Sequence, residues 1–203
     1  MKGSSIALSQ DDSALAVQAA HSPDAFAEIY RRYYARVFNY VRYRCEDLET
    51  TEDLTAQIFE RLLLKIGSYC PERSPFSAWL FAIVRNEVSG YWRTARRRLW
   101  ISIESLWRWP SREPDPEQAA VQSEAQADLL AAIQRLSERE RDLLGLKFGG
   151  RLTNRQIAGL TGLSESHVGV ILYRAVRRLR EELLAEGEAF MTLAAMEHSH
   201  ESA

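Results

Sequence analysis

A chain of 203 residues with 46% apolar and 27% charged side chains suits one medium domain or two small ones, and such a composition excludes disorder throughout. The formal net charge of −2 excludes a uniformly basic nucleic-acid coat, so the placement of charge matters more than its total. Two cysteines, Cys45 and Cys70, are too few for a disulfide scaffold and lie in no metal-ligand spacing, so we expect no bound metal.

The sequence favours a cytoplasmic protein. No apolar run approaches the roughly 18 residues that suggest a membrane span, and the first twelve residues lack the apolar stretch of a secretion signal. In that compartment we expect the two cysteines to be ordinary reduced thiols, with a redox pair as the less favoured alternative.

Residues 22–98 are predicted to form three helices after an N-terminal extension, 1–21. Ser74 and Pro75 suit the start of the third helix, because serine caps helices well and proline is tolerated at the first helical position. Apolar residues at the helical spacing mark the first two helices: Phe26, Ile29, Tyr30, Tyr33, Val37 and Val41, then Leu54, Ile58 and Leu62.

The second half begins with a linker, residues 99–124, that is rich in proline and acidic side chains. Residues 125–186 are predicted to be helical again. Capping boxes at Ser137 with Glu140 and at Thr153 with Gln156 each open a helix there. The tail, 187–203, is expected to fray. The predicted fold class is therefore all-α, with two small helical domains joined by a flexible acidic linker.

Residues 153–179 have the spacing of a helix-turn-helix. Gly162 suits the left-handed turn, Ala158 allows a close crossing, and Val168 and Leu172 would hold the second helix by its inner side. The outer side could then enter a major groove, whereas a helical hairpin with a solvated basic face is the alternative. We expect these residues at the DNA: Arg155, Ser164, Ser166, His167, Val170, Ile171, Arg174, Arg177 and Arg178.

Two charged segments in the first half point to different partners. Residues 91–98 hold four arginines and two aromatic residues without an acid, a composition that suits phosphates and unpaired bases. Residues 46–53 hold five acids without intervening lysine or arginine. Such a surface repels DNA, so we expect it to meet a basic protein partner.

Together these segments resemble the extracytoplasmic-function sigma factors over roughly residues 22–186. Residues 51–59 (TEDLTAQIF) look like the family's polymerase-binding segment, and residues 76–86 (FSAWLFAIVRN) look like its promoter-melting helix. Residues 136–141 (LSERER) and 173–175 (YRA) resemble the beginning of the −35 domain and the end of its recognition helix.

The resemblance implies a promoter-recognition subunit, not an enzyme, whose partners are core RNA polymerase, promoter DNA and an anti-sigma factor. It implies a region 2 at 22–98, with polymerase contacts at Glu49, Glu52, Asp53 and Gln57. The −10 contacts would be Lys65, Ser68, Tyr69, Asn86, Trp92, Arg93, Arg96 and Arg97. Region 4 at 125–186 would place the helix-turn-helix residues given above at the −35 element, and the linker would follow the RNA-exit path of polymerase.

The recognition helix departs from the family pattern. Gly169, Val170 and Ile171 stand where polar or basic side chains are common, and apolar groups cannot make bidentate contacts to guanine. A free-standing helix-turn-helix regulator that binds operator DNA is the alternative function. An enzyme is disfavoured, because the sequence holds no phosphate loop, no metal-ligand cluster and no nucleophile–base spacing, and no cofactor is expected.

Overall fold

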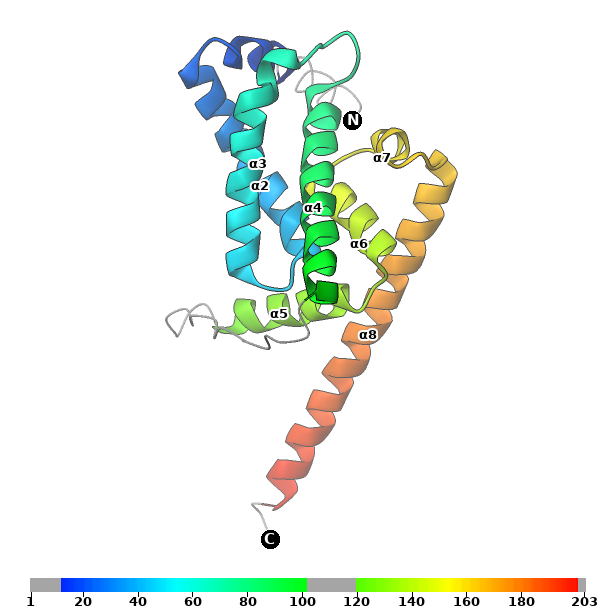
Figure 1. The fold of residues 1–203 in the computed structure, drawn as a ribbon. Coiled ribbons are helices and arrows are strands. Elements are labelled where there is room, and N and C mark those ends of the chain that lie inside the picture. The colour runs from blue at the N-terminus through cyan, green and yellow to red at the C-terminus, as the bar shows by residue number, and fades with distance from the viewer. Residues whose placement is uncertain (1–11, 102–119, 201–203) are drawn as a thin grey trace.

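The computed structural model describes residues 12–101 and 120–200, with side chains described for 12–95 and 127–185 (Figure 1). All regular elements in these ranges are helical, which confirms the all-α prediction. They are α2 (Pro23–Arg44), α3 (Leu48–Lys65), the 3-10 turn η1 (Ile66–Ser68), α4 (Phe76–Ile101), α5 (Ala120–Gln134), α6 (Glu138–Leu144), the π-helical turn η2 (Gly145–Gly149), α7 (Asn154–Thr161) and α8 (Glu165–His200). The acidic linker was predicted at 99–124; its central part, 102–119, lies outside the described residues, while 99–101 belong to α4 and 120–124 to α5.

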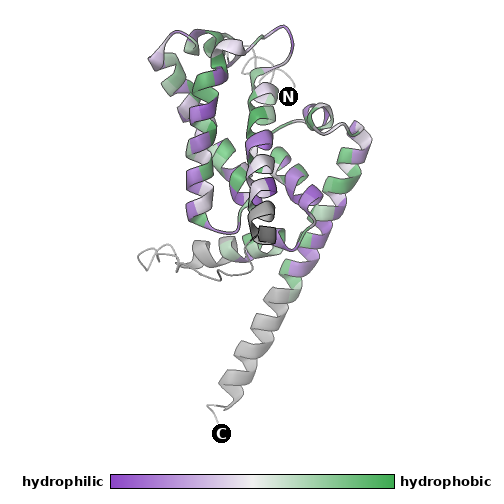
Figure 2. Ribbon diagram, in the orientation of Figure 1, coloured by the Kyte–Doolittle hydropathy of each residue, from purple (hydrophilic) through white to green (hydrophobic). Residues whose placement is uncertain are grey.

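The N-terminal module, residues 12–101, packs α2, α3 and α4 around a common core. Helix α2 starts as the sequence suggests, because the side chain of Ser22 accepts a hydrogen bond from the Ala25 amide and Pro23 is the first helical residue. Helix α4 begins at Phe76, so Ser74 and Pro75 lie just before it. Figure 2 shows apolar and polar residues alternating along α3, the pattern of a helix that is buried on one side.

The N-terminal extension is partly folded, which the sequence analysis did not predict. Residues 12–19 are helical, and Ala16 and Ala19 are buried against the module. Asp12 accepts a hydrogen bond from the Tyr33 hydroxyl at 2.7 Å and pairs with Arg32 at 2.9 Å. These contacts tie the extension to the middle of α2.

The C-terminal module, residues 120–200, contains both predicted capping boxes. The Ser137 side chain accepts from the Glu140 amide while Glu140 accepts from the Ser137 amide, and Thr153 and Gln156 repeat this exchange before α7. The carboxylate of Glu140 is partly desolvated, but hydrogen bonds from Ser137 and the nearby Arg178 guanidinium outweigh that effect and lower its pKa. The local sequence signals therefore set both helix starts.

The two modules pack directly against each other. Helix α2 lies on η2 and α6, and α4 lies beside α7 (Figure 1). The buried side chains of the two modules form one cluster, which includes Tyr40 and Phe81 from one side and Leu144 and Leu146 from the other. The sequence analysis predicted two modules but not this contact.

Helix α8 differs from the expected frayed tail. It runs without interruption from Glu165 to His200, and its C-terminal part projects away from the other helices in Figure 1. In the described part of the chain, none of the helices is both long enough and apolar enough to cross a membrane.

We expect the folded N-terminal extension to contribute to stability. Ala16→Glu should lower the free energy of unfolding by about 3 kcal/mol or more, because the fully buried position would receive an unpaired charge. Ala14→Glu is the matched control on the exposed side of the same helix and should change stability by less than about 0.5 kcal/mol. Urea denaturation followed by circular dichroism measures both, and equal effects would show that the extension is not packed in solution.

The helix-turn-helix turn allows a second stability test. Gly162 has a φ of 73°, so Gly162→Ala should cost about 1–2 kcal/mol through left-handed strain alone, since nothing lies within 4 Å of an added Cβ. Gly159→Ala, in the preceding helix and equally unobstructed, should be neutral or stabilise by about 0.5–1 kcal/mol. A thermal melt in which Gly162→Ala is as stable as Gly159→Ala would contradict the observed turn.

Candidate nucleic-acid interface

The helix-turn-helix is built as the sequence predicts. Gly162 ends α7 in the left-handed conformation, and Ser164 begins the next helix by accepting from the His167 amide at 3.2 Å. Val168 and Leu172 are buried, so they fix α8 by its inner side. The opposite side of the first turns of α8 is uncovered, which is the requirement for entering a major groove.

Most residues predicted at the −35 element lie on this uncovered surface. Ile171 is only half-buried, so of the three unusual apolar positions Val170 alone is well exposed, at 46%. Tyr173, at 69%, is a neighbour that the sequence analysis missed, although it lies seven residues after Ser166 and thus on the same side of the helix. The exposed members of the predicted set are Arg155, Ser164, Ser166, His167, Val170, Arg174, Arg177 and Arg178.

The arginines of this surface differ in whether they form ion pairs within the protein. Arg177 pairs with Glu181 at 3.4 Å, and Arg178 pairs with Glu140 at 3.3 Å. The Arg177–Glu181 pair is exposed at both ends, so it is worth little and can exchange for a phosphate, whereas the Glu140 side chain of the second pair is only 15% exposed. Arg155 and Arg174 have no ion pair within the described residues, and they present their charge to solvent.

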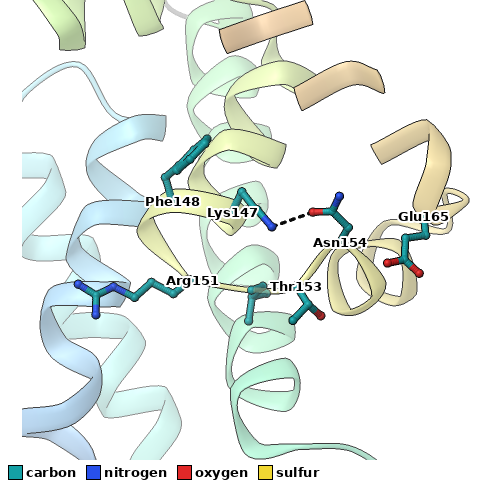
Figure 3. A pocket seen from close by; sticks show the side chains of 7 residues that line it. Lys147, Phe148, Arg151, Thr153, Asn154 and Glu165 are labelled. Atoms are coloured by element: carbon teal, nitrogen blue, oxygen red, sulfur yellow. Dashed lines mark hydrogen bonds between the residues drawn. The ribbon is translucent and has the colours of Figure 1, made fainter. Parts of the chain in front are cut away.

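A depression of about 550 Å³ lies beside the helix-turn-helix (Figure 3). In Figure 3 the ammonium group of Lys147 points to Asn154, and the Nζ–Oδ1 distance is 2.9 Å. Arg151 joins η2 to α7 with a positive φ of 53°. In Figure 3 the guanidinium group of Arg151 extends away from Asn154, so Lys147 is the cation at the N-terminal end of α7, and Glu165 at the rim opposes an anion there. The sequence analysis missed this depression, because its walls meet only after the π-helical turn forms.

The acidic residues of α3 form an exposed surface. Glu49, Glu52, Asp53 and Gln57 are all exposed, and their spacing places them on neighbouring turns. Asp47 has a local role instead, because its side chain caps α3 by accepting from the Thr50 amide at 2.6 Å. No ion pair involves Glu52 or Asp53 in the described part of the chain, so their charge is available to a partner.

The residues predicted at the −10 element do not meet in one pocket. Lys65, Ser68, Asn86 and Arg93 are exposed and Trp92 is half-buried. Asn86 lies ten residues along α4 from Phe76, or about 15 Å along the helix axis. The side chains of Arg96 and Arg97 lie outside the described ones. The structure therefore places Asn86, Trp92 and Arg93 in a strip along α4, while Lys65 lies at the end of α3 and Ser68 in η1.

Tyr69 is the exception, because it is only 8% exposed. Its ring packs on Phe76 and Trp79, with centroids 5.4 and 5.2 Å away. Its hydroxyl lies 2.9 Å from the Ser13 hydroxyl and donates to the Ser74 carbonyl at 3.0 Å. In this conformation Tyr69 is a core residue that fastens the loop 69–75 to the extension.

Both cysteines are free. Cys45 is buried, and burial raises the pKa of its thiol to about 11, so the thiol is protonated at neutral pH. The Cys70 thiol donates to Glu72 at 2.9 Å. The structure thus shows no disulfide between them.

The matches to known protein families fall on the same two modules. Residues 29–98 match the family model described as Sigma-70 region 2, and residues 126–179 match the one described as Sigma-70, region 4. Similar proteins include the ECF RNA polymerase sigma factor BldN of Streptomyces coelicolor, 33% identical over 160 residues, which are 79% of this chain and 61% of BldN. The ECF RNA polymerase sigma factor RpoE of Cereibacter sphaeroides is 28% identical over 159 residues, 78% of this chain and 86% of RpoE.

A solved structure shares the fold. The sigma factor RpoE of Bartonella quintana, crystallised with the anti-sigma factor NepR, aligns with a TM-score of 0.61 and 22% identity over 78% of this chain and 96% of that chain. The two sigma-70 regions occur in the expected order and together cover more than half of the sequence. The chain therefore belongs to the ECF sigma factors of the sigma-70 family.

Proposed function

We propose that this protein binds core RNA polymerase, directs it to promoters by recognising −10 and −35 elements, and helps to melt the DNA. The observation that carries the proposal is the uncovered outer side of the first turns of α8, held by Gly162 in a chain that also has a sigma-70 region 2. A free-standing operator-binding regulator would have no use for that N-terminal module.

The acidic surface of α3 is proposed as the polymerase contact. Glu52 and Asp53 are exposed and have no ion-pair partner among the described residues, so a basic surface on polymerase could neutralise them. Their carboxylates would instead be repelled by DNA phosphates. The family resemblance assigns the same segment to the clamp of the largest polymerase subunit.

The strip along α4 is proposed as the −10 contact. Asn86 offers an amide that can both donate and accept hydrogen bonds, and Arg93 offers a cation on the same helix. A base that leaves the stack costs a few kcal/mol, which hydrogen bonds and stacking must offset. The promoter-melting role therefore falls to this module, whose region 2 boundaries we propose at 22–98.

Region 4, proposed at 125–186, would contact the −35 element through α8. The exposed side of the helix combines Ser166, Val170 and Tyr173 with arginines further along. Phosphate contacts fix position but carry no direct base information. The −35 contact should accordingly depend strongly on salt and discriminate weakly at guanine.

We also propose control by an anti-sigma factor in the cytoplasm. The RpoE of Bartonella quintana, which shares the fold, was solved together with the anti-sigma factor NepR. The exposed acidic surface of α3 and the exposed side of α8 are both accessible to such a partner.

We expect reversal of the acidic surface to weaken polymerase binding. Glu52→Lys and Asp53→Lys should each lower the affinity for core RNA polymerase about tenfold, because opposite charges would become like charges. Asp128→Lys makes the same charge reversal at an exposed position of α5 and should leave the affinity unchanged. A competition assay against a labelled sigma factor measures all three, and equal affinities across the set would refute the assigned contact.

The two DNA contacts should respond differently to mutation. Asn86→Ala should change the preferred −10 sequence, whereas Arg177→Ala should weaken binding almost equally at every sequence and reduce the salt slope by about one. Holoenzyme binding to a randomised promoter library at two salt concentrations separates these effects. A change of preference at a single −35 base in Arg177→Ala would identify Arg177 as a base reader and contradict the assigned role.

A further inference from the structure

Tyr69 lies where the N-terminal extension, the loop 69–75 and helix α4 meet. Its side chain is 8% exposed, and its ring packs on Phe76 and Trp79 of α4. Its hydroxyl donates to the Ser74 carbonyl at 3.0 Å. This bond joins the two ends of the loop, because Tyr69 is the first residue of the loop and Ser74 is the last but one.

The extension adds a second hydrogen bond to the same hydroxyl. The Oγ atom of Ser13 lies 2.9 Å from the hydroxyl oxygen of Tyr69. A phenol has one proton and can also accept, so Tyr69 can donate to the Ser74 carbonyl while it accepts from Ser13. We call these three residues the hydroxyl clip. It connects the extension to both ends of the loop.

The extension is held on the module by contacts that do not involve the loop. Ala16 and Ala19 are buried, and Asp12 accepts a hydrogen bond from the Tyr33 hydroxyl at 2.7 Å. Ser13 lies between these anchors in the sequence. Its position is therefore set by the extension, and the loop is fastened to an element that is already fixed.

The outer part of the loop does not rest on the extension. A groove of about 580 Å³ opens between them, with Ala14 and Val17 on one wall and residues 71–75 on the other. Val17 is 46% exposed at this groove. The hydroxyl clip therefore bridges two segments that are otherwise separated here, and removal of one hydroxyl should release the loop without unpacking the helices.

The loop joins the two parts of the proposed −10 contact. Ser68 lies immediately before it in η1, and α4, which contains Asn86 and Arg93, follows it. The conformation of the loop therefore sets where Ser68 lies relative to the start of α4. Groups that recognise a ligand must be held to within about 0.5 Å of their productive geometry, so a loosened loop would weaken the choice among bases.

We propose that the N-terminal extension is a specificity element of this sigma factor, in which Ser13, acting through Tyr69, holds the loop 69–75 in the conformation that reads the −10 element. This inference rests on the proposed −10 contact and deepens it. Tyr69 then serves −10 recognition as a positioning residue, although its side chain is buried. The region 2 match begins at residue 29, so Ser13 lies outside the matched segment.

Hydrogen exchange in the free protein tests the hydroxyl clip itself. Tyr69→Phe and Ser13→Ala each remove one hydroxyl and keep the ring and the helix. The amides of residues 69 and 73, which donate backbone hydrogen bonds at the loop, should exchange at least about fivefold faster in both variants. Tyr43→Phe is the matched control, because it deletes a hydroxyl near the C-terminal end of α2 and should leave both amides unchanged. Unchanged exchange in Tyr69→Phe and Ser13→Ala would overturn the proposal.

The second test measures how the holoenzyme chooses among promoters. In a library randomised at both elements, Tyr69→Phe and Ser13→Ala should reduce the preference for the best −10 sequence about three- to tenfold. The −35 preference and the affinity for core RNA polymerase should stay the same. General destabilisation would lower binding to every promoter alike and change neither preference. Ser13→Thr, which keeps the hydroxyl, should retain the wild-type preference.

The double variant decides whether Ser13 acts through Tyr69. Ser13→Ala combined with Tyr69→Phe should reduce the −10 preference no further than Tyr69→Phe alone. Additive losses, an unchanged −10 preference in the single variants, or an equal change at the −35 element would each contradict the assigned role. A wild-type holoenzyme without any −10 preference would refute the proposed function instead, while hydrogen exchange would still decide whether the extension holds the loop.

Discussion

The burial of Tyr40 is the constraint on which this structure depends. Its ring lies against Gly145 of one module and against the Phe81 ring of its own, with centroids 5.9 Å apart and nearly perpendicular, while Gly149 lies against its backbone. Burial first, and then the nearby Asp142 carboxylate, raise the pKa of its hydroxyl well above 10, so the group stays neutral and donates to that carboxylate. Tyr40 thus contacts both Gly145, where the π-helical turn begins, and Asp142 of α6.

The sequence predicted the features that depend on nearby residues. Thr153 with Gln156, Ser137 with Glu140, and the left-handed Gly162 each act within a few positions, and each appears in the structure as expected. The exposed side of α8 follows from the same helical period. Local chemistry therefore accounted for most of the helices and for the shape of the DNA-binding motif.

The contact between the modules could not be predicted in this way. In the sequence, Gly149 and Gly150 look like an ordinary helix end. In the structure, the backbone of Tyr40 lies against Gly149 and the ring of Phe81 lies against Gly150, both more than sixty positions away in the chain. Asp142 gave no signal inside its short helix, because its partners, Tyr40 and Arg85, are distant in the chain. The packing of the N-terminal extension was not predicted either, because it depends on small residues such as Ala16, which give no strong apolar pattern. Tyr69 was expected to contact DNA, but its side chain is buried in this structure.

Helix α8 connects the recognition residues to the far end of the described chain without a break. It has 36 residues and is about 54 Å long. Its first turns are held by the buried side chains of Val168 and Leu172. The end near His200 lies about 51 Å from Ser166 along the helix axis, so a contact made there leaves the DNA-reading surface uncovered.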